Sequence, residues 1–249
     1  MGRLADSTYP MLITIAIPAF NEEELLPSTL AAVAEAGEAF TQRGWEMEVV
    51  VCDNNSTDST GEIAKAAKAR VVFEKENQIS RSRNAAGHAA KGEWIVFVDA
   101  DSTPSERLFA ATADLMEQAE VIGGGAVVTA GVLPFWGRMG LGTWNCISRV
   151  FKLPAGSYIF CRAKDFRELE GFSTKLYAAE EIEFGLRLRR RAWRQSQRVR
   201  IIRHPPLLTS NRRIQAPWAM LAFVLTAALT LGFSLRWRGG CGMWYDGRR

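Results

Sequence analysis

The sequence predicts an α/β protein whose mostly parallel sheet is flanked by helices, and two observations carry this prediction. First, strand-like and helix-like patterns alternate four times up to about residue 129, which favours crossover connections between parallel strands. Second, residues 95–98 form an unbroken β-branched and aromatic run, which is typical of a strand buried on both faces. The chain has 249 residues and is 47% hydrophobic, so it can bury a sizeable core.

The elements can be justified in order along the chain. A first strand is expected over residues 12–17, and it ends at residues 18–21, Pro-Ala-Phe-Asn. Asn21 can cap a helix that continues to about Ala36, because the three glutamates that follow Asn21 complement the helix dipole. The remaining expected strands are 49–52, 71–73, 122–129, 158–162 and 199–202, and the remaining expected helices are 59–69, 80–90, 104–118 and 178–191.

Two later stretches depart from this alternation. Residues 131–156 are rich in glycine and aromatic residues and are interrupted by Pro134 and Pro154, so we expect a loop and a short helix over a site. Residues 218–235 carry no charge over 18 positions, which is the lower limit for a membrane span. An apolar C-terminal helix that lies on a membrane or packs against the rest of the chain fits this stretch as well as a span does.

Two carboxylates, Asp99 and Asp101, follow the central strand. They lie where an open α/β sheet collects its ligands. Like charges at a strand end are costly unless a cation lies between them, and a hard divalent cation that also holds a diphosphate would satisfy both. A helix cap and a solvated aspartate explain the pair equally well.

The charge of the chain is unevenly distributed. Residues 185–249 contain 14 arginines, no lysine and one acid, whereas residues 1–184 contain 17 basic and 26 acidic residues. An arginine-only basic tail suggests contact with phosphates, either of a substrate or of an anionic membrane surface. No nucleic-acid-binding motif accompanies the charge, so we do not expect a nucleic-acid partner.

The four cysteines include no C-x-x-C pair, and the chain has only two histidines, so a zinc site is not expected. No signal-like segment precedes Met11. We therefore expect reduced thiols and a cytoplasmic protein, peripheral to the membrane or anchored at its cytoplasmic face.

Five motifs occur in a fixed order, and together they resemble the family 2 glycosyltransferases of the bacterial type. The motifs are Ile-Pro-Ala-Phe-Asn-Glu-Glu at 17–23, Asp53 with Asn-Ser-Thr-Asp-Ser-Thr at 55–60, Arg-Ser-Arg-Asn-Ala-Ala-Gly at 81–87, Val-Asp-Ala-Asp at 98–101, and Gly171-Phe172 followed by Glu180-Glu181. The resemblance covers residues 11–213 and implies a nucleotide-sugar-dependent catalytic domain of the GT-A fold, a Rossmann-like mixed sheet. Residues 214–249 would then be an apolar helix and basic tail.

The resemblance implies a hexosyltransferase that moves a sugar from a nucleoside diphosphate donor, a UDP-sugar in the first instance, to a lipid-linked or saccharide acceptor. It implies inversion and assistance by Mn²⁺ or Mg²⁺. Asp53 would accept a hydrogen bond from N3–H of uracil, although a turn or helix-cap role also explains it. Arg81 would contact a phosphate, although it could also be a solvated arginine. The residues expected at the nucleotide are Pro18, Phe20, Glu22, Asp53, Arg81, Asn84 and Asp99.

The resemblance also implies a base and a metal site. Glu181 occupies the position of the family's catalytic aspartate, Glu180 is the second candidate, and both could simply be acids in the first turn of a helix. Asp101 is the expected metal ligand, and Asp99 would contact the ribose, or the metal through water. His204 has the right order in the chain for a further metal ligand, although a lone histidine is more often structural.

Three other functions are compatible with parts of this pattern. A retaining GT-A glycosyltransferase would share the same motifs. A nucleotidyltransferase would need a glycine-rich loop after the first strand, where this chain has Pro-Ala-Phe-Asn. A non-catalytic nucleotide-binding, membrane-associated protein would not need the combination of Arg81, Asp99, Asp101 and Glu181.

Overall fold

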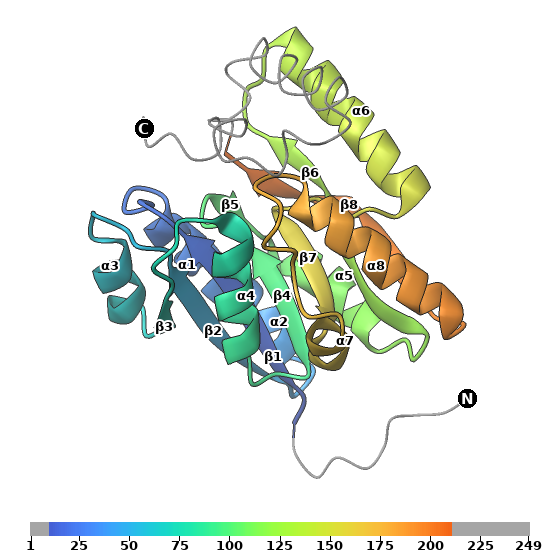
Figure 1. Ribbon diagram of the computed structural model, residues 1–249, viewed down its shortest axis with the longest axis horizontal. Coiled ribbons are helices and arrows are strands. Elements are labelled where there is room, and N and C mark those ends of the chain that lie inside the picture. The colour runs from blue at the N-terminus through green and yellow to red at the C-terminus, as the bar shows by residue number, and fades with distance from the viewer. Residues whose placement is uncertain (1–9, 211–249) are drawn as a thin grey trace.

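Eight strands form one mixed sheet across residues 10–210, the part of the chain that this computed structural model describes (Figure 1). The strand order is β3-β2-β1-β4-β7-β6-β8-β5. The strands are β1 (Leu12–Ala19), β2 (Glu46–Asp53), β3 (Arg70–Phe73), β4 (Trp94–Val98), β5 (Ser102–Thr103), β6 (Val121–Ala130), β7 (Tyr158–Arg162) and β8 (Arg198–Thr209). The helices are α1 (Leu26–Ala36), α2 (Glu38–Thr41), α3 (Thr60–Ala66), α4 (Ile79–Ala89), α5 (Glu106–Met116), α6 (Phe135–Phe151), α7 (Ala163–Glu168) and α8 (Glu180–Arg194).

The first half of the sheet is parallel. Strand β1 pairs in parallel with β2 on one side and with β4 on the other, and β3 continues the parallel order beyond β2. Ala19 at the end of β1 lies opposite Asp53 at the end of β2. Helices connect these strands, so their carboxyl ends all reach the same edge of the sheet.

The second half is mixed because β7 runs antiparallel to both β4 and β6, while β8 runs parallel to β6. Three consecutive glycines in β6 permit this close packing. A Cβ on Gly124 would lie 1.9 Å from the carbonyl oxygen of Arg200, and a Cβ on Gly123 would lie 2.6 Å from that of Phe160. Any larger residue at Gly124 would push β8 away from β6.

Alternating side chains of the central strands fill a hydrophobic core on each face of the sheet. Ile13, Ile15 and Ile17 of β1 belong to one cluster, with residues of α1, α2 and α5, whereas Ala16 belongs to the other. The second cluster contains residues of α4, α7 and α8, including Phe166 and Phe184. This division follows from the two-residue period of a strand. It confirms the expectation of a sheet covered by helices on both faces.

Two elements differ from the expected ones. Helix α6 has 17 residues where a loop and a short helix were expected, because Pro134 is the N-cap residue of α6 and Pro154 follows its C-cap, Lys152. Strand β8 continues to Thr209 instead of ending at Ile202, because Arg203–Pro206 fall within a register irregularity where a proline needs no ladder N–H.

Three short elements, α2, β5 and α7, were not expected from the sequence. The apolar stretch 218–235 lies outside the described residues. Within residues 10–210, no helix combines the length and the apolar character needed to cross a membrane.

Candidate active site

The candidate active site lies at the edge of the sheet where the parallel strands β1, β2 and β4 end. Because β1 lies between β2 and β4, Asp53 and Asp99 follow strands on opposite sides of β1. The ends of β2 and β4 are thus two strand spacings, or about 10 Å, apart. The topology therefore brings together three of the predicted motifs that are far apart in the sequence.

Arg83 of α4 is the centre of a buried cluster at this edge, and its side chain is only 2% exposed. Its Nη1 donates to Oε1 of Glu180 at 2.6 Å. Its Nη2 donates to Oδ1 of Asp99 and to the carbonyl oxygen of Gly156, both at 3.0 Å. The guanidinium also lies 5.5 Å from the ring centroid of Phe172, within the range of a cation–π contact.

Arg83 was not among the residues predicted from the sequence, which pointed to Arg81. The helical period of α4 is the sequence feature that could have identified Arg83. Arg83 is three to four residues from Ser80 and Gly87, and all three are buried on the inward face of α4. Arg81 points elsewhere. Its Nε lies 3.0 Å from Oε2 of Glu76 and donates to Oε1 of Gln78.

The charges of this cluster are strongly coupled. Burial alone would lower the pKa of Arg83, but the carboxylates of Asp99, Glu180 and Glu181 outweigh it and hold the pKa above its usual value. Burial, and then the nearby Glu181 carboxylate, raise the pKa of Glu180 to about 8, while Arg83 opposes the rise. Three carboxylates therefore face one guanidinium, and the cluster retains a proton near neutral pH.

The first turn of α8 directs two adjacent carboxylates to different places. Glu180 is buried against Arg83, whereas Glu181 is half-buried. Successive residues of a helix point about 100° apart. A Cβ on Gly156 would lie 3.4 Å from Cδ of Glu181, so this carboxylate flanks the chain at Gly156. Ala179, which precedes both, has a left-handed backbone with φ of 62°.

The other two predicted aspartates are held by the main chain and by a serine. Oδ2 of Asp101 accepts a hydrogen bond from the hydroxyl of Ser210 at 2.5 Å, next to the pairing of β5 with β8. Oδ1 of Asp53 accepts a hydrogen bond from the N–H of Ser56 at 2.9 Å. Asp53 therefore stabilises a turn, whatever else it contacts.

The predicted nucleotide residues of the first motif occupy the end of β1 and the loop after it. Pro18 is a buried residue of β1, Phe20 is half-buried, and Glu22 is 6% exposed. The N–H of Glu22 donates to Oγ1 of Thr60 at 2.8 Å. The loop after β1 is thereby attached to the start of α3, which follows the Asp53 turn.

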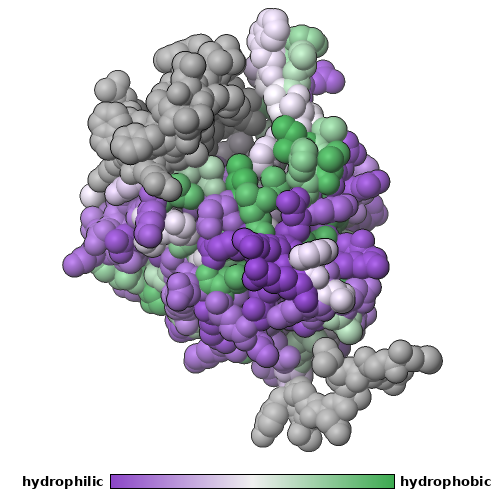
Figure 2. Space-filling model, turned by 45° about the vertical axis from the view of Figure 1, so that its right-hand side comes forward, coloured by the Kyte–Doolittle hydropathy of each residue, from purple (hydrophilic) through white to green (hydrophobic). Residues whose placement is uncertain are grey.

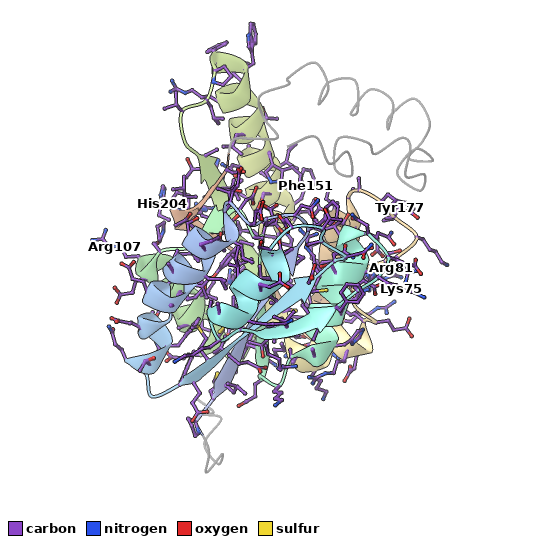
Figure 3. The ribbon with its side chains drawn as sticks, turned by 90° about the vertical axis from the view of Figure 1, so that its left-hand side faces the viewer. Lys75, Arg81, Arg107, Phe151, Tyr177 and His204 are labelled. Carbon is purple, nitrogen blue, oxygen red and sulfur yellow. The ribbon has the colours of Figure 1, made fainter. Side chains whose placement is uncertain are left out.

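Asn84 and His204 lie apart from the arginine cluster's polar contacts. The Asn84 amide donates to the carbonyl of Phe172 and accepts from its N–H, both at 2.8 Å, so it fixes the loop beneath Arg83. His204 is exposed in the irregular part of β8, and Figure 3 shows it on the opposite side of the molecule from Arg81. Ser210, whose hydroxyl contacts Asp101, lies six positions further along the chain, beyond the irregular part of β8.

Few side chains at the candidate site could bind a divalent cation. Residues 10–210 contain no group of three or more His, Cys, Asp or Glu side chains that could hold a metal by themselves. Asp99 already binds Arg83, which leaves the carboxylate of Asp101 as the better placed hard oxygen donor. Mg²⁺-type sites often use one or two carboxylates with substrate phosphates and water, so this donor set fits a metal bound together with a diphosphate.

Comparisons with known proteins identify a family and relatives of this chain. A sequence model of glycosyl transferase family 2 matches residues 14–170, a range that includes Asp53, Arg83, Asp99 and Asp101 but ends before Glu180. An uncharacterized glycosyltransferase of Mycobacterium tuberculosis is 32% identical over 130 residues, which cover 51% of this chain and 55% of the relative. The chain thus spans about half the length of this relative.

A second relative has a more specific name. The UDP-Glc:α-D-GlcNAc-diphosphoundecaprenol β-1,3-glucosyltransferase of Escherichia coli is 32% identical over 94 residues, which cover 36% of this chain and 35% of the relative.

Two solved structures share the fold at low sequence identity. The mannosyltransferase of Pyrobaculum calidifontis in complex with GDP-Man and Mn²⁺ has a TM-score of 0.67 at 20% identity, over 87% of this chain and 62% of that one. The glucosyl-3-phosphoglycerate synthase of M. tuberculosis, with Mn²⁺, UDP and glucosyl-3-phosphoglycerate, has a TM-score of 0.63 at 18% identity, over 88% of this chain and 79% of that one.

Proposed function

This chain belongs to glycosyl transferase family 2 and has the GT-A fold, and we propose that it transfers a hexose from a UDP-sugar to an acceptor hydroxyl with inversion. The observation that carries the proposal is the convergence of Asp99, Glu180 and Glu181 on Arg83 at the carboxyl edge of the parallel strands. The proposed catalytic unit comprises residues 11–213.

Glu181 is the proposed general base. In an inverting transfer, the acceptor oxygen forms a bond to the anomeric carbon while the bond from that carbon to the diphosphate breaks, and the hydroxyl proton passes to the base. Glu181 is half-buried next to Gly156, whereas Glu180 is committed to Arg83. A carboxylate with access to an incoming acceptor is the one that can take its proton.

Arg83 is a proposed positioning residue. It binds Glu180, Asp99 and the main chain at Gly156 simultaneously, so it connects the base-bearing turn of α8 to the end of β4. Charge-assisted hydrogen bonds from the planar fork of a guanidinium fix orientation as well as charge. Arg83 thereby holds the neighbouring Glu181 at a fixed position relative to the proposed donor site.

The donor is proposed to lie along the sheet edge, with its base near Asp53 and Pro18–Phe20 and its diphosphate near Asp101. Asp101 would hold Mn²⁺ or Mg²⁺, which supplies neutralising charge for the departing diphosphate. The E. coli relative named for UDP-Glc and the M. tuberculosis structure with UDP support a UDP donor, and the P. calidifontis structure makes a GDP donor the alternative.

The acceptor is proposed to be lipid-linked. The E. coli relative is named for a diphosphoundecaprenol-linked acceptor, and a relative from Aeromonas hydrophila is named an undecaprenyl-phosphate 4-deoxy-4-formamido-L-arabinose transferase. Such an acceptor would require the enzyme to work at the cytoplasmic surface of a membrane.

A thermal-shift series with the full chain tests the donor. UDP, GDP and dTDP are compared with and without Mn²⁺, and UDP with Mn²⁺ is expected to raise the melting temperature most. A ligand at one hundred times its Kd adds about 2.7 kcal/mol of stability. A larger shift with GDP would reassign the base, and no shift with any of the three nucleotides would contradict the proposed function. The anomeric configuration of the product, determined by NMR, then tests inversion.

A further inference from the structure

Helix α6 presents an apolar face to solvent along its whole length. The side chains of Phe135, Trp136 and Val150 are 64%, 66% and 66% exposed. At 100° per residue, the outward side of α6 carries no charged residue over a sector of about 160°. The residues of this outward face are Phe135, Trp136, Met139, Gly140, Thr143, Cys146, Ile147, Val150 and Phe151.

The opposite side of α6 is firmly attached, so the outward face is not available to the core. Leu141 and Trp144 pack against the core. The side chain of Asn145 accepts from the N–H of Val128 and donates to its carbonyl oxygen, and Ser148 donates to the carbonyl oxygen of Leu153. Figure 2 shows α6 projecting from the top of the molecule, with pale and green residues along it. Contiguous apolar surface of this kind marks an interaction site.

The charges that α6 itself carries are all positive. Arg138 and Arg149 flank the outward face on one side, and Lys152 ends the helix. The chain contains no acidic residue between Glu120 and Asp165. A helix with an apolar face and only cations among its charged residues complements the surface of an anionic bilayer, where acyl chains adjoin negative headgroups.

We propose that α6 docks flat on an anionic lipid bilayer through its outward face. Its 17 residues span about 25 Å, less than the roughly 30 Å of a hydrocarbon core, so the helix lies along the surface. The chain after α6 reaches Gly156, which contacts Arg83 and flanks Glu181. Docking through α6 would therefore place the proposed catalytic edge close to the membrane, where the lipid-linked acceptor of the proposed function would be found. The docking itself does not depend on that function.

Vesicle flotation of the full chain tests the docking. We expect binding to vesicles of phosphatidylcholine with 30% phosphatidylglycerol, weaker binding to phosphatidylcholine alone, and loss of binding at high salt. The variant Phe135→Ser/Trp136→Ser should lower partitioning at least tenfold. Phe73→Ser is the matched control, because Phe73 is equally exposed but lies on β3 at the far end of the sheet, and it should leave partitioning unchanged. Equal partitioning of wild type and the α6 variant would overturn the proposal, as would a wild type that does not float.

A probe on Cys146 shows whether α6 itself meets the lipid. Cys146 is exposed on the outward face, and Cys52 and Cys161 are buried. In a Cys241→Ser background, an environment-sensitive fluorophore on Cys146 should shift to shorter wavelength only when anionic vesicles are added, and brominated lipids should quench it. The same fluorophore on Glu62→Cys in a Cys146→Ser/Cys241→Ser chain should not respond.

Two other occupants of the outward face would appear as different results. A blue-shifted Cys146 probe without vesicles would mean that residues 211–249 or a second copy of the chain already cover the face, and a dependence on protein concentration would identify the second copy. Either result overturns membrane docking through α6. Because neither assay uses a donor or a turnover measurement, failure of the docking is distinguishable from failure of the proposed function.

Discussion

At the scale of single residues, Arg83 determines how much negative charge the site can hold. Three carboxylates lie close enough to raise the pKa of this one guanidinium, and two of them, Asp99 and Glu180, bind it directly. Like charges that share a site resist simultaneous ionisation. Glu180, the most buried of them, therefore has a raised pKa and retains its proton to a higher pH.

The raised pKa of Glu180 predicts a pH-dependent stability. The folded protein binds this proton up to about pH 8, whereas the unfolded chain releases it near 4.5. The folded state thus binds more protons between these values, so the free energy of unfolding should fall as the pH rises from about 5 to 8, by at most about 1.4 kcal/mol per pH unit from this group. Urea unfolding of wild type and Glu180→Gln at pH 5, 6, 7 and 8 measures it. The variant should have the flatter profile, and parallel profiles would contradict the coupling.

Substitution of the two adjacent glutamates separates the base from its neighbour. Glu181→Gln should lower kcat by about 10²–10⁴-fold, because the amide keeps the shape but cannot take a proton. The Kd for UDP should stay the same, since the proposed donor contacts lie on β1, β2 and β4. Glu180→Gln is the matched control and should remain within tenfold of wild type. If Glu180→Gln is inactive and Glu181→Gln is active, the base is assigned to the wrong glutamate. If both remain active, the base lies outside α8.

At the scale of elements, alternation predicted the parallel half of the sheet because strand-like segments rich in apolar residues alternate there with helices. The positions of the aspartates at the ends of β2 and β4 could be predicted for the same reason, because a strand that is predicted correctly also fixes where its last side chains lie. The insertion of β7 antiparallel between β4 and β6 has no local signal, because it depends on which distant strand pairs with a five-residue segment.

The residues that were misjudged share a physical cause. Pro134 is expected to interrupt residues 131–156, yet it is the N-cap residue of α6. The last strand is expected to end at residue 202, yet it continues through Pro205 in a strand irregularity, and neither proline must donate a hydrogen bond there. Arg81 and Arg83 are equivalent in the motif, and only the phase of α4 distinguishes the inward arginine. The contacts of Glu180 with Arg83 join residues 97 positions apart, which no local pattern encodes.

The loop between α7 and α8 offers a test at this scale. Gly171 has φ of +65°, and a Cβ there would lie 2.4 Å from Oδ1 of Asn84, the amide that binds Phe172 beneath Arg83. Gly44 has a similar φ of +72° but nothing within 4 Å of its Cβ position. Gly44→Ala should cost about 1–2 kcal/mol from the left-handed backbone alone. Gly171→Ala should cost more, because it also displaces Asn84.

Chemical denaturation of both glycine variants gives the difference directly. The excess loss in Gly171→Ala measures the cost of displacing Asn84 together with the ring of Phe166, whose Cζ would lie 3.0 Å from the new Cβ. A matching loss of transfer activity would link the Asn84–Phe172 contact to the position of Arg83. Equal losses in the two variants would mean that the loop adjusts without cost.

At the scale of the whole molecule, the sheet separates the two aspartates that are proposed to bind the donor. Asp53 ends β2 and Asp101 follows β4, with β1 between those strands. Asp53 is attached to the turn before α3, and Asp101 to Ser210 after β8. A ligand that reaches both must lie across the end of β1, as an extended nucleoside diphosphate can.

This arrangement predicts that the two aspartates affect different parts of the donor. Asp101→Ala should abolish the increase in UDP affinity that Mn²⁺ produces, because its carboxylate is the proposed ligand of the metal on the diphosphate.

Asp53→Asn keeps an oxygen for the N–H of Ser56 but presents an amide N–H₂ to N3–H of uracil. It should therefore weaken the binding of UMP by about 1.5–3 kcal/mol and leave the binding of pyrophosphate with Mn²⁺ unchanged. Calorimetry with UMP, UDP and pyrophosphate measures each part. Because β1 separates the strands that carry the two aspartates, the double variant should show additive losses for UDP. If UMP and pyrophosphate weaken together in Asp53→Asn, Asp53 acts only through its turn. Unchanged Mn²⁺ dependence in Asp101→Ala would place the metal, and with it the diphosphate, elsewhere on the sheet edge.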